Sequence, residues 1–575
     1  MERGIGTSRG IGIGHVLIVY NASAVVNRGT HYNAEEEKKR FFEARKTFIE
    51  QTEELLSELE KKLGESDKDA LVLKNQIYLA RDITTENEVV AAIDNSHICA
   101  EAAFDDVCNK LIQLFSSMDN PDMQQRVTDI QDMRERMIQT LQGTKAFDLT
   151  NLPDNTVIVA DEIKPSMTAS MDIAHVAGIV AEKGGDTAHA SILARALEIP
   201  AVLSVKGILQ KVKNGDSIII DGAYGEVFIN PTQRTFSIYE KKKKKYEEHI
   251  EELKTFINKS TETADGKKVM LAANIGGADE AAKAFKAGAE GVGLFRTEFL
   301  FLNKNALPTE EEQFEEYKKA AVLTKGMPLT IRTLDIGGDK DIPYMGLTKE
   351  TNPFLGYRAI RFCLDRVDIF TTQLRAILRA SAYGSIRIMI PMITSVNEVR
   401  QVKDMIKKIC SDLDHNGISY DKNIQTGVMI ETPAAAIMAD AIAQEVDFFS
   451  IGTNDLTQYT IAVDRCNENV AYLYSAFNPA VLRLIRRIIE CAHNAGIEAG
   501  MCGEAAANAL MAPILLSFGL DEFSVSTGKV LETRKTIADW TLKEAGLVTD
   551  KVMSMATEKE VTDYLSDYIS ERNKK

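Results

Sequence analysis

The chain has 575 residues, and at about 100–200 residues per domain this length predicts three or four domains. Hydrophobic residues make up 45% and charged residues 26%, which is typical of a folded globular protein and excludes wholesale disorder. The net charge of −16 gives the chain no global electrostatic attraction to nucleic acid or to an anionic membrane.

Membrane and disulfide-rich classes are also disfavoured by the sequence. No apolar run reaches the roughly 20 residues that a membrane helix needs, and the start, MERGIGTSRG, lacks the apolar core of a signal peptide. We therefore expect a cytoplasmic protein with no membrane insertion. The seven cysteines are scattered and include no C-x-x-C pair, so we expect neither a disulfide framework nor a zinc site.

The first part of the chain has a glycine-rich start followed by a helical segment. Residues 1–20 alternate glycine with apolar residues and end in a strand-like run at 15–20. The glycines precede this strand and lack the G-x-G-x-x-G spacing, which disfavours a dinucleotide site. Across residues 35–143 apolar residues recur every three or four positions. That pattern predicts packed antiparallel helices.

Residues 150–231 change to short β-rich runs separated by turn signals. One helix is predicted among them at 191–197, and Pro200 follows its end. A charged stretch at 240–255 contains five consecutive lysines followed by glutamates, which favours a solvated helical linker over a nucleic-acid patch. The predicted strands of this region span 156–160, 201–205, 217–220 and 226–229.

From about residue 265, strand-like and helical runs alternate eight times. Eight β/α units in about 300 residues are the number and size of a (β/α)8 barrel. In that fold the chemistry lies just beyond the carboxyl ends of the strands. The predicted strands span 269–273, 291–295, 329–334, 386–390, 427–430, 448–451, 498–501 and 523–526.

Charged residues follow several of these predicted strands. Arg296, Arg332 and Arg465 could form a cationic pocket, because guanidinium groups pair bidentately with carboxylate and phosphate. Glu431 and Asp455 offer two hard oxygen ligands of the kind that holds Mg²⁺ beside a substrate phosphate. A single charged residue after a strand is common, so this interpretation depends on their joint placement.

Asn454 and Cys502 complete the set. Asn454 can add a neutral hydrogen-bond donor, and Cys502 is a free thiol within the sequence GMCGE. A lone cysteine is usually a small buried hydrophobe, and that interpretation stays open beside a chemical role. A substrate that carries both carboxylate and phosphate and binds with Mg²⁺ fits the whole set. Phosphoenolpyruvate is the obvious candidate.

One histidine, His189, is a candidate nucleophile. It follows Gly184 and Gly185 and comes just before the predicted helix at 191–197. Backbone N–H groups at a helix start can receive a phosphoryl group, and imidazole near neutral pH is partly unprotonated and nucleophilic. A surface loop histidine without a chemical role is the alternative.

Longer runs of the sequence are specific enough to indicate a family. They include GVGLFRTEFL at 291–300, LPTEEEQ at 307–313, DIGGDK at 335–340, NPFLGYRAIR at 352–361, ETPAAA at 431–436, FFSIGTNDLTQY at 448–459 and MCGE at 501–504. With these runs, the chain resembles Enzyme I of the bacterial phosphotransferase system over essentially all of its length. The members of that family are phosphoenolpyruvate–protein phosphotransferases.

The resemblance implies a multidomain α/β fold. A phosphohistidine α/β domain would span 1–20 and 148–230, with a helical phosphocarrier-docking subdomain inserted at 21–147. A helical linker would follow at 231–260. A (β/α)8 barrel at 261–575 would bind phosphoenolpyruvate and form a homodimer.

The resemblance also implies a role for each candidate residue. His189 would be phosphorylated through Nε2, and Cys502 would be the acid that protonates the enolate carbon. Glu431 and Asp455 would hold Mg²⁺. The phosphoryl acceptor would be the histidine phosphocarrier protein HPr, in the first step of sugar uptake, with release of pyruvate. The phosphoenolpyruvate clamp would consist of Arg296, Arg332, Asn454, Asp455 and Arg465.

The sequence departs from the Enzyme I pattern beside His189. Residues 184–189 read GGDTAH where the family usually has GGRTSH, so Asp186 replaces an arginine and Ala188 a serine. A carboxylate there should disfavour an added phosphate dianion, or Asp186 could cap the following helix. A non-catalytic or altered-partner regulatory paralogue is therefore one alternative. A dikinase-type enzyme is another, although the 188 residues before His189 contain no P-loop.

Overall fold

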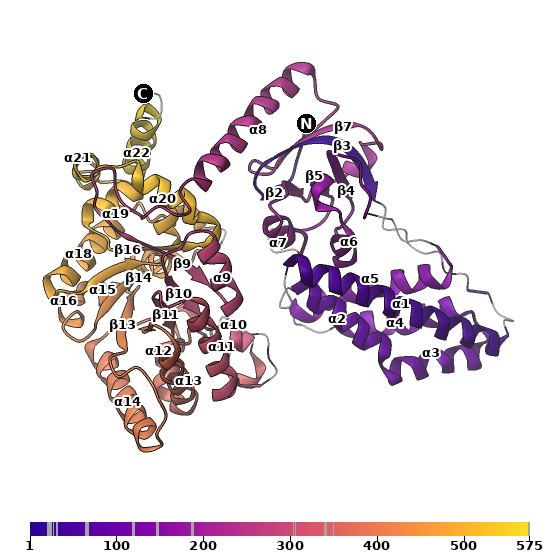
Figure 1. The fold of residues 1–575 in the computed structure, drawn as a ribbon, viewed down its shortest axis with the longest axis horizontal. Coiled ribbons are helices and arrows are strands. Elements are labelled where there is room, and N and C mark those ends of the chain that lie inside the picture. Colours follow the sequence, from indigo (N-terminus) through magenta and orange to yellow (C-terminus); the bar gives the residue numbers. More distant parts are fainter. Residues whose placement is uncertain are drawn as a thin grey trace. The chain divides into compact units, whose positions relative to one another are not determined.

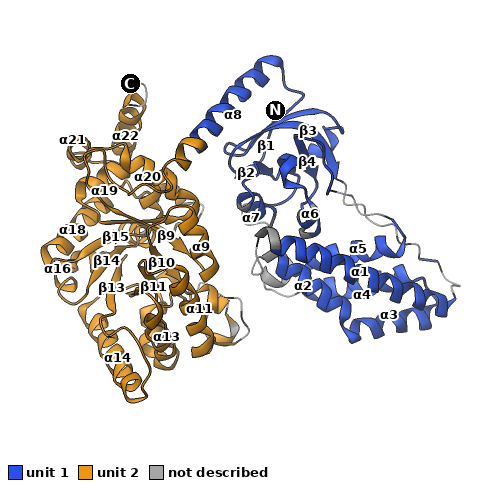
Figure 2. Ribbon diagram, in the orientation of Figure 1, with its two compact units in different colours: residues 1–250 blue, residues 251–575 orange. Residues whose placement is uncertain are grey.

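A computed structural model of the chain describes residues 1–19, 26, 28–29, 33–63, 68–117, 121–144, 149–185, 189–302, 304, 306–337, 342–348, 350–467 and 469–572. The chain divides into two compact units, Met1–Ile250 and Glu251–Lys575 (Figure 2). We call them the sheet unit and the barrel unit and describe each by itself. Among the described helices, none is both long enough and apolar enough to cross a membrane.

The sheet unit contains a mixed sheet whose strands come from both sides of a helical insertion (Figure 1). β3 (Ile11–Val19) pairs in parallel with β4 (Thr156–Ala160), and His15 lies opposite Thr156. Within the described residues the strand order is β1-β8-β7-β3-β4-β5-β6-β2. The other strands are β1 (Glu2–Arg3), β2 (Ile5–Ser8), β5 (Val176–Ala181), β6 (Ala201–Leu203), β7 (Ser217–Asp221) and β8 (Glu226–Ile229).

Several elements of this unit differ from the sequence-based expectation. β3 begins at Ile11 rather than at 15, and β6 ends at Leu203 rather than at 205. The strand β5 was not predicted, because its apolar run is bounded by charged residues rather than by turn signals. The prediction of a single helix is wrong, since α6 (Pro165–Ser170) precedes β5 and is too short for a helical period to show. The helix predicted at 191–197 is α7 (His189–Ala196), which begins two residues earlier.

The insertion is a bundle of long helices. Its core contains Phe41, Phe48 and Phe104, whereas Phe42 is 40% exposed. In the described residues the bundle consists of α1 (Ala34–Leu63), α2 (Lys68–Arg81), α3 (Ile83–Ser96), α4 (Ala100–Ser116) and α5 (Pro121–Leu141).

The short helix α6 joins the insertion to the sheet. It packs against α1, α2 and α5. Lys164, just before α6, places its Nζ 2.5 Å from Glu135 Oε2 on α5. The hydroxyl of Ser166 donates a hydrogen bond of 2.7 Å to Asp132 Oδ1, also on α5. These contacts connect the bundle to the same layer of the unit that contains α7.

The helix α8 (Gln233–Lys254) follows the sheet and contains the five-lysine run at 241–245. These lysine side chains are exposed or half-buried. Lys243 and Lys244 lie within 3.9 Å of glutamates one turn later on the same helix. Exposure and mixed charge are the properties of a solvated helix.

The barrel unit is a closed barrel of parallel strands (Figure 1). The last strand pairs with the first over five residues, which closes the ring. One predicted strand, at 329–334, runs two residues too far, because β11 ends at Arg332. In the described residues the strands are β9 (Met270–Ile275), β10 (Val292–Arg296), β11 (Leu329–Arg332), β12 (Ile386–Ile390), β13 (Gln425–Ile430), β14 (Phe448–Ile451), β15 (Glu498–Met501) and β16 (Glu522–Ser526).

Helices surround the barrel and cover the outer face of its strands (Figure 1). Its single tryptophan, Trp540, is buried near the carboxyl end and stacks on Tyr568. The helices of the described residues are α9 (Ala278–Lys286), α10 (Phe299–Leu302), α11 (Glu310–Leu323), α12 (Ile360–Asp365), α13 (Val367–Ala380), α14 (Val396–His415), α15 (Pro433–Ile437), α16 (Ala439–Ile442), α17 (Thr453–Ile461), α18 (Pro479–Ala495), α19 (Ala512–Phe518), α20 (Val530–Ala538), α21 (Leu542–Met553) and α22 (Glu558–Arg572).

Alternation along the strands decides which side chains face the barrel interior. In β12, Ile386, Ile388 and Ile390 belong to the large core formed with the helices, whereas Met389 between them packs inside the barrel. Successive side chains of a strand point to opposite faces of the sheet. The side chain after a strand therefore points to the face opposite that of the last strand residue. The interior cluster consists of Leu294, Met389, Met429, Phe448 and Cys502.

Candidate functional site

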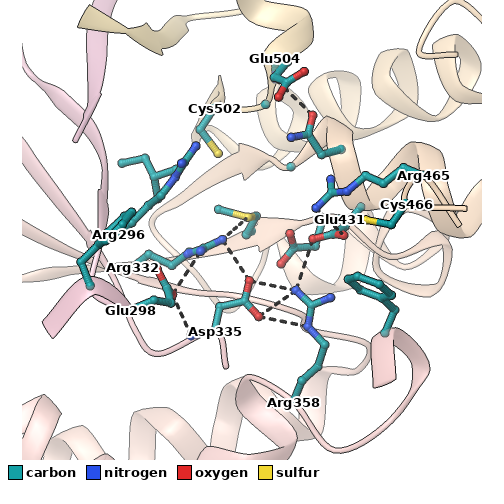
Figure 3. Close-up of a pocket in the computed structure, with 18 of the residues that line it drawn as sticks. Arg296, Glu298, Arg332, Asp335, Arg358, Glu431, Arg465, Cys466, Cys502 and Glu504 are labelled. Atoms are coloured by element: carbon teal, nitrogen blue, oxygen red, sulfur yellow. Dashed lines mark hydrogen bonds and ion pairs between the residues drawn. The ribbon is translucent and has the colours of Figure 1, made fainter. Parts of the chain in front are cut away.

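A cavity of about 570 Å³ opens where the barrel strands end; we call it the barrel cavity (Figure 3). Arg296 and Arg332 are the last residues of β10 and β11, and Glu431 and Cys502 are the first residues after β13 and β15. The cavity is lined by all seven barrel residues that the sequence singled out: Arg296, Arg332, Glu431, Asn454, Asp455, Arg465 and Cys502.

Two glycines let the chain pack closely around the barrel cavity. Gly452 precedes α17, whose first turn contains Asn454 and Asp455. A Cβ at Gly452 would lie 2.7 Å from Glu431 Oε2, and a Cβ at Gly503 would lie 1.9 Å from a hydroxyl of α17. Contacts that short require glycine, so these two positions bring the loops after β13, β14 and β15 together.

A network of arginines and carboxylates forms one wall of the cavity (Figure 3). Arg332 lies 3.1 Å from Glu298 and 3.2 Å from Asp335. Asp335 also accepts hydrogen bonds of 2.9 and 3.0 Å from Arg358 Nη2, which lies 3.4 Å from Asp455 Oδ2. Burial lowers the pKa of Arg332, but the neighbouring carboxylates outweigh it and raise that pKa above its ordinary value.

Reasoning from strand ends alone misses Arg358. It lies in the long connection between β11 and β12 rather than directly after a strand, and only the 352–361 run contains it. Its Nη1 donates a hydrogen bond of 3.2 Å to the hydroxyl of Tyr459. The next residue, Ala359, has a φ of +51°, a backbone state that costs about 1–3 kcal/mol and persists only where surrounding contacts impose it.

Two buried carboxylates, Glu431 and Asp455, line the cavity. Glu431 Oε1 accepts a hydrogen bond of 2.6 Å from the N–H of Met392. Glu431 is 1% exposed, and burial, followed by the nearby Asp455 and Asp335, raises its pKa well above the ordinary value. Asp455 Oδ1 is buried without a hydrogen-bond partner among the described residues, and Arg465 Nη2 at 3.9 Å is too distant to donate one. A cation between these oxygens would satisfy both groups.

Cys502 follows the last residue of β15 and lines the cavity. Its side chain is 5% exposed and packs with the apolar cluster of the barrel interior. Burial raises the pKa of its thiol to about 11, so the thiol is protonated near neutral pH. The Sγ atom lies 3.9 Å from the carbonyl oxygen of Ile451.

The candidate nucleophile His189 belongs to the sheet unit. It is the first residue of α7 and not, as expected, a residue before the helix. Gly184 has a φ of +105°, a conformation that favours glycine, and Gly185 accepts a hydrogen bond of 2.5 Å from the hydroxyl of Ser191. Asp186 and Ala188 lie outside the described residues, as does the side chain of His189.

Models of known protein families match three parts of the chain. The model for the "PEP-utilising enzyme, PEP-binding domain" matches residues 250–542. The "PEP-utilising enzyme, mobile domain" model matches 152–225, and the "PEP-utilising enzyme, N-terminal" model matches 3–126. The first match spans more than half of the chain and includes the barrel and its cavity.

Curated relatives match over nearly the whole length. A phosphoenolpyruvate-protein phosphotransferase of Bacillus sp. (strain S) is 43% identical over 98% of this chain and 97% of its own. The protein of the same name from Bacillus subtilis (strain 168) is 41% identical over 98% of this chain and 99% of its own. That from Buchnera aphidicola subsp. Schizaphis graminum (strain Sg) is 40% identical, with 99% and 100% covered.

Proposed function

We propose that this chain, which belongs to the phosphoenolpyruvate-protein phosphotransferase family, carries the phosphoryl group of phosphoenolpyruvate to His189 and then to a protein acceptor. The barrel cavity is the observation that carries the proposal. Four arginines, three buried carboxylates and a buried thiol line one space at the end of a barrel. That combination suits an anion bearing both carboxylate and phosphate, whose reaction ends with a proton transfer.

The arginines would bind the substrate. Arg332 is held by Glu298 and Asp335, which fixes its guanidinium plane, and its buried Nε has no hydrogen-bond partner among the described residues. A donor left unpartnered in a buried place favours an anionic acceptor there. Arg296 and Arg465 line the same cavity and would complete the clamp, with Asn454 as a neutral donor.

Glu431 and Asp455 would hold Mg²⁺. Both are hard oxygen donors, both are buried, and one oxygen of Asp455 is unpartnered among the described residues. No cluster of three or more potential metal-ligating side chains occurs in the part of the chain that the structure describes, so substrate oxygens and water would complete the shell. When bound, the ion neutralises charge on the phosphoryl oxygens.

His189 would accept the phosphoryl group on Nε2. The nitrogen forms a bond to phosphorus while the bond between phosphorus and the enol oxygen breaks, which leaves the enolate of pyruvate in the barrel cavity. The thiol of Cys502 is protonated and would deliver its proton to C3 of that enolate. The start of α7 offers backbone N–H groups to the phosphorylated residue.

The helical bundle would dock the acceptor, the phosphocarrier HPr. Leu71 and Tyr78 lie seven residues apart on α2, and they are 48% and 71% exposed. Ile83, at the start of α3, is 70% exposed. Large apolar side chains exposed together on a helix pair mark a surface that a partner covers.

A second copy of the chain would cover part of the barrel unit. Large apolar side chains are exposed on several connections that follow barrel strands: Leu355 at 66%, Ile437 at 58%, Met438 at 46% and Tyr472 at 78%. Burial of such residues between two copies would stabilise a homodimer.

Labelled phosphoenolpyruvate tests this proposal directly. The chain is incubated with phosphoenolpyruvate labelled in its phosphoryl group and with Mg²⁺, and the label is then located in the protein. We expect one acid-labile, alkali-stable label on His189, which forms together with an equal amount of pyruvate and passes to HPr on its addition. A chain that takes up no label, or takes it up on another residue, would contradict the proposal.

A further inference from the structure

We infer that Asn274 is a positioning residue that holds Cys502 in place for proton delivery, an inference that rests on the proposed function. Asn274 is the fifth residue of β9, next to the end of that strand. It does not line the barrel cavity, whereas Cys502 does. Any effect of Asn274 on the reaction would therefore pass through the residues that it holds.

The contacts of Asn274 converge on the backbone of Cys502. Its Nδ2 donates a hydrogen bond of 3.0 Å to the carbonyl oxygen of Cys502 and one of 3.3 Å to the carbonyl oxygen of Ser524. The hydroxyl of Ser524 in turn donates a bond of 2.6 Å to Asn274 Oδ1. The amide of Asn274 is thus held at both its nitrogen and its oxygen.

These partners define the orientation of the Asn274 amide. An Nδ2 group can only donate and a backbone carbonyl oxygen can only accept, so Nδ2 must face the two carbonyl oxygens. A flipped amide would place Oδ1 against both carbonyl oxygens. Aspartate at this position would do the same with a negative charge, so asparagine is required by the acceptors around it.

The backbone of Cys502 is then fixed from two sides of the barrel. Its N–H donates a bond of 3.2 Å to the carbonyl oxygen of Ile451 on β14, and its carbonyl oxygen accepts from Asn274 on β9. The Cys502 Sγ atom lies inside the ring formed by the strands, among the apolar side chains of the interior cluster. Fixing the backbone on both sides limits the positions open to the thiol.

Position matters because the proton must reach one face of a planar carbon. The S–H bond breaks, its proton bonds to C3 with the electron pair of the C2=C3 bond, and the enolate oxygen forms a double bond to C2. The remaining thiolate takes a proton from water. A displacement of about 1 Å in such a group slows a reaction about a hundredfold.

The stereochemistry of pyruvate reports this positioning. Phosphoenolpyruvate with deuterium in one defined position at C3 is turned over in tritiated water, which gives a chiral methyl group. A fixed thiol protonates one face, so we expect the wild-type chain to give one configuration in excess. Enolpyruvate that leaves the site is protonated by water on both faces and gives no excess.

Asn274→Ala is expected to lose the configurational excess. We expect pyruvate formation to fall about tenfold or more, while phosphohistidine formation stays within about threefold of wild type. Ser524→Ala keeps the donors of Asn274 but frees its amide to rotate, and should lose only part of the excess. In a Cys502→Ser background, Asn274→Ala should add little further loss, because both changes act on one step.

A matched control separates positioning from stability. Thr549 donates a buried hydrogen bond of 3.4 Å to the carbonyl oxygen of Pro513, outside the barrel cavity. Like Asn274→Ala, Thr549→Val removes a buried hydrogen bond to a backbone carbonyl. We expect this variant to keep the full configurational excess of pyruvate even if its melting temperature falls.

The possible results point in different directions. Loss of excess in Asn274→Ala with phosphohistidine formation kept supports the inference. An unchanged configurational excess in Asn274→Ala would overturn the inference. So would an equal fall in phosphohistidine and pyruvate formation that Thr549→Val reproduces. Either result would leave the proposed function intact. A wild-type chain that forms neither phosphohistidine nor pyruvate would overturn both.

Discussion

The barrel unit and the sheet unit hold their reactive groups by different physical means. In the barrel, every strand has two hydrogen-bonded neighbours, so a residue at a strand end is held from both sides. Arg332 and Cys502 are placed in this way, at the ends of β11 and β15. In the sheet unit, His189 begins α7, a helix of eight residues that follows the glycine pair at 184–185.

Because of this difference, we expect sequence changes near His189 to affect the position of the reactive group more than changes in the barrel loops do. A barrel side chain points inward or outward according to its place in the alternation, and a change in a neighbouring loop does not alter that direction. The placement of His189 depends on a connection that contains Gly184 in a left-handed conformation. The chain departs from the Enzyme I pattern in that connection, at 186 and 188, and keeps the pattern in the barrel.

His189→Ala has the largest expected effect, and it distinguishes the role of the sheet unit in phosphorylation from that of the barrel unit in substrate binding. Phosphoenzyme formation should fall by at least about a thousandfold, since no other group replaces the nucleophile. Phosphoenolpyruvate should still bind the barrel unit with unchanged affinity, as measured by calorimetry with Mg²⁺. A mutant that still takes up label on a histidine would show that the nucleophile lies elsewhere.

Arg332→Lys tests whether the barrel site depends on geometry as well as charge. Lysine keeps the charge but cannot reproduce the planar contact with Glu298 and Asp335 or donate from Nε. Without the bidentate fork toward the substrate anion, kcat/KM should fall by about a hundredfold. Arg400→Lys is the control, because Arg400 makes an exposed ion pair and should keep its activity.

Cys502→Ser separates proton delivery from substrate binding. A hydroxyl is a far weaker acid than a thiol, so pyruvate formation should fall about a hundredfold while phosphoenolpyruvate binds as before. Burial raises the pKa of the wild-type thiol to about 11, and the acid form persists below that value. Proton delivery should therefore be constant from about pH 6 to 9 and decline only as pH rises toward 11.

Full pyruvate formation in the serine variant would show that another group supplies the proton. A decline that begins near neutral pH would contradict the burial argument, because it would require a thiol with an ordinary pKa.

Glu431→Gln and Asp455→Asn test the metal assignment without relying on turnover. Each amide is a weaker ligand than the carboxylate it replaces, so the affinity for Mn²⁺ in the presence of phosphoenolpyruvate should fall at least about tenfold. Electron paramagnetic resonance measures the free ion. Glu445→Gln changes a carboxylate that pairs with Arg400 outside the cavity and should leave the affinity unchanged.

The eight barrel strands and the direction of the charged residues after them could be predicted from the sequence. Short apolar runs that recur with helical segments between them define the barrel, and Arg332, Glu431 and Cys502 stand directly at strand ends. Asn274 lies beyond the predicted strand 269–273, and its role depends on which carbonyl oxygens it contacts in the folded barrel. Those partners are far away in the sequence.

Elements that depend on tertiary contacts could not be predicted. Arg358 comes to the cavity on a long connection without a regular period, and α6 is too short to show one. The start of α7 was misplaced by two residues because helix propensity does not define a first turn that follows glycines. The secondary structure of long periodic segments follows from their local sequence pattern, whereas that of short segments depends on the residues they pack against.

The smallest expected effect concerns Asp186, where the sheet unit departs from the Enzyme I pattern. Asp186 lies outside the described residues, three positions before His189. A carboxylate near the phosphohistidine repels it, and Asp186→Arg would replace that repulsion with a charge-assisted contact. A change of about 1 kcal/mol would shift the phosphoenzyme equilibrium toward phosphohistidine about fivefold.

Salt and melting temperature distinguish this effect from a capping role of Asp186. An electrostatic shift should shrink as salt is added, since screening weakens interactions between exposed charges. Loss of a helix cap should instead lower stability by about 1 kcal/mol and leave the equilibrium unchanged. A less stable variant with an unmoved equilibrium would assign a structural role to Asp186.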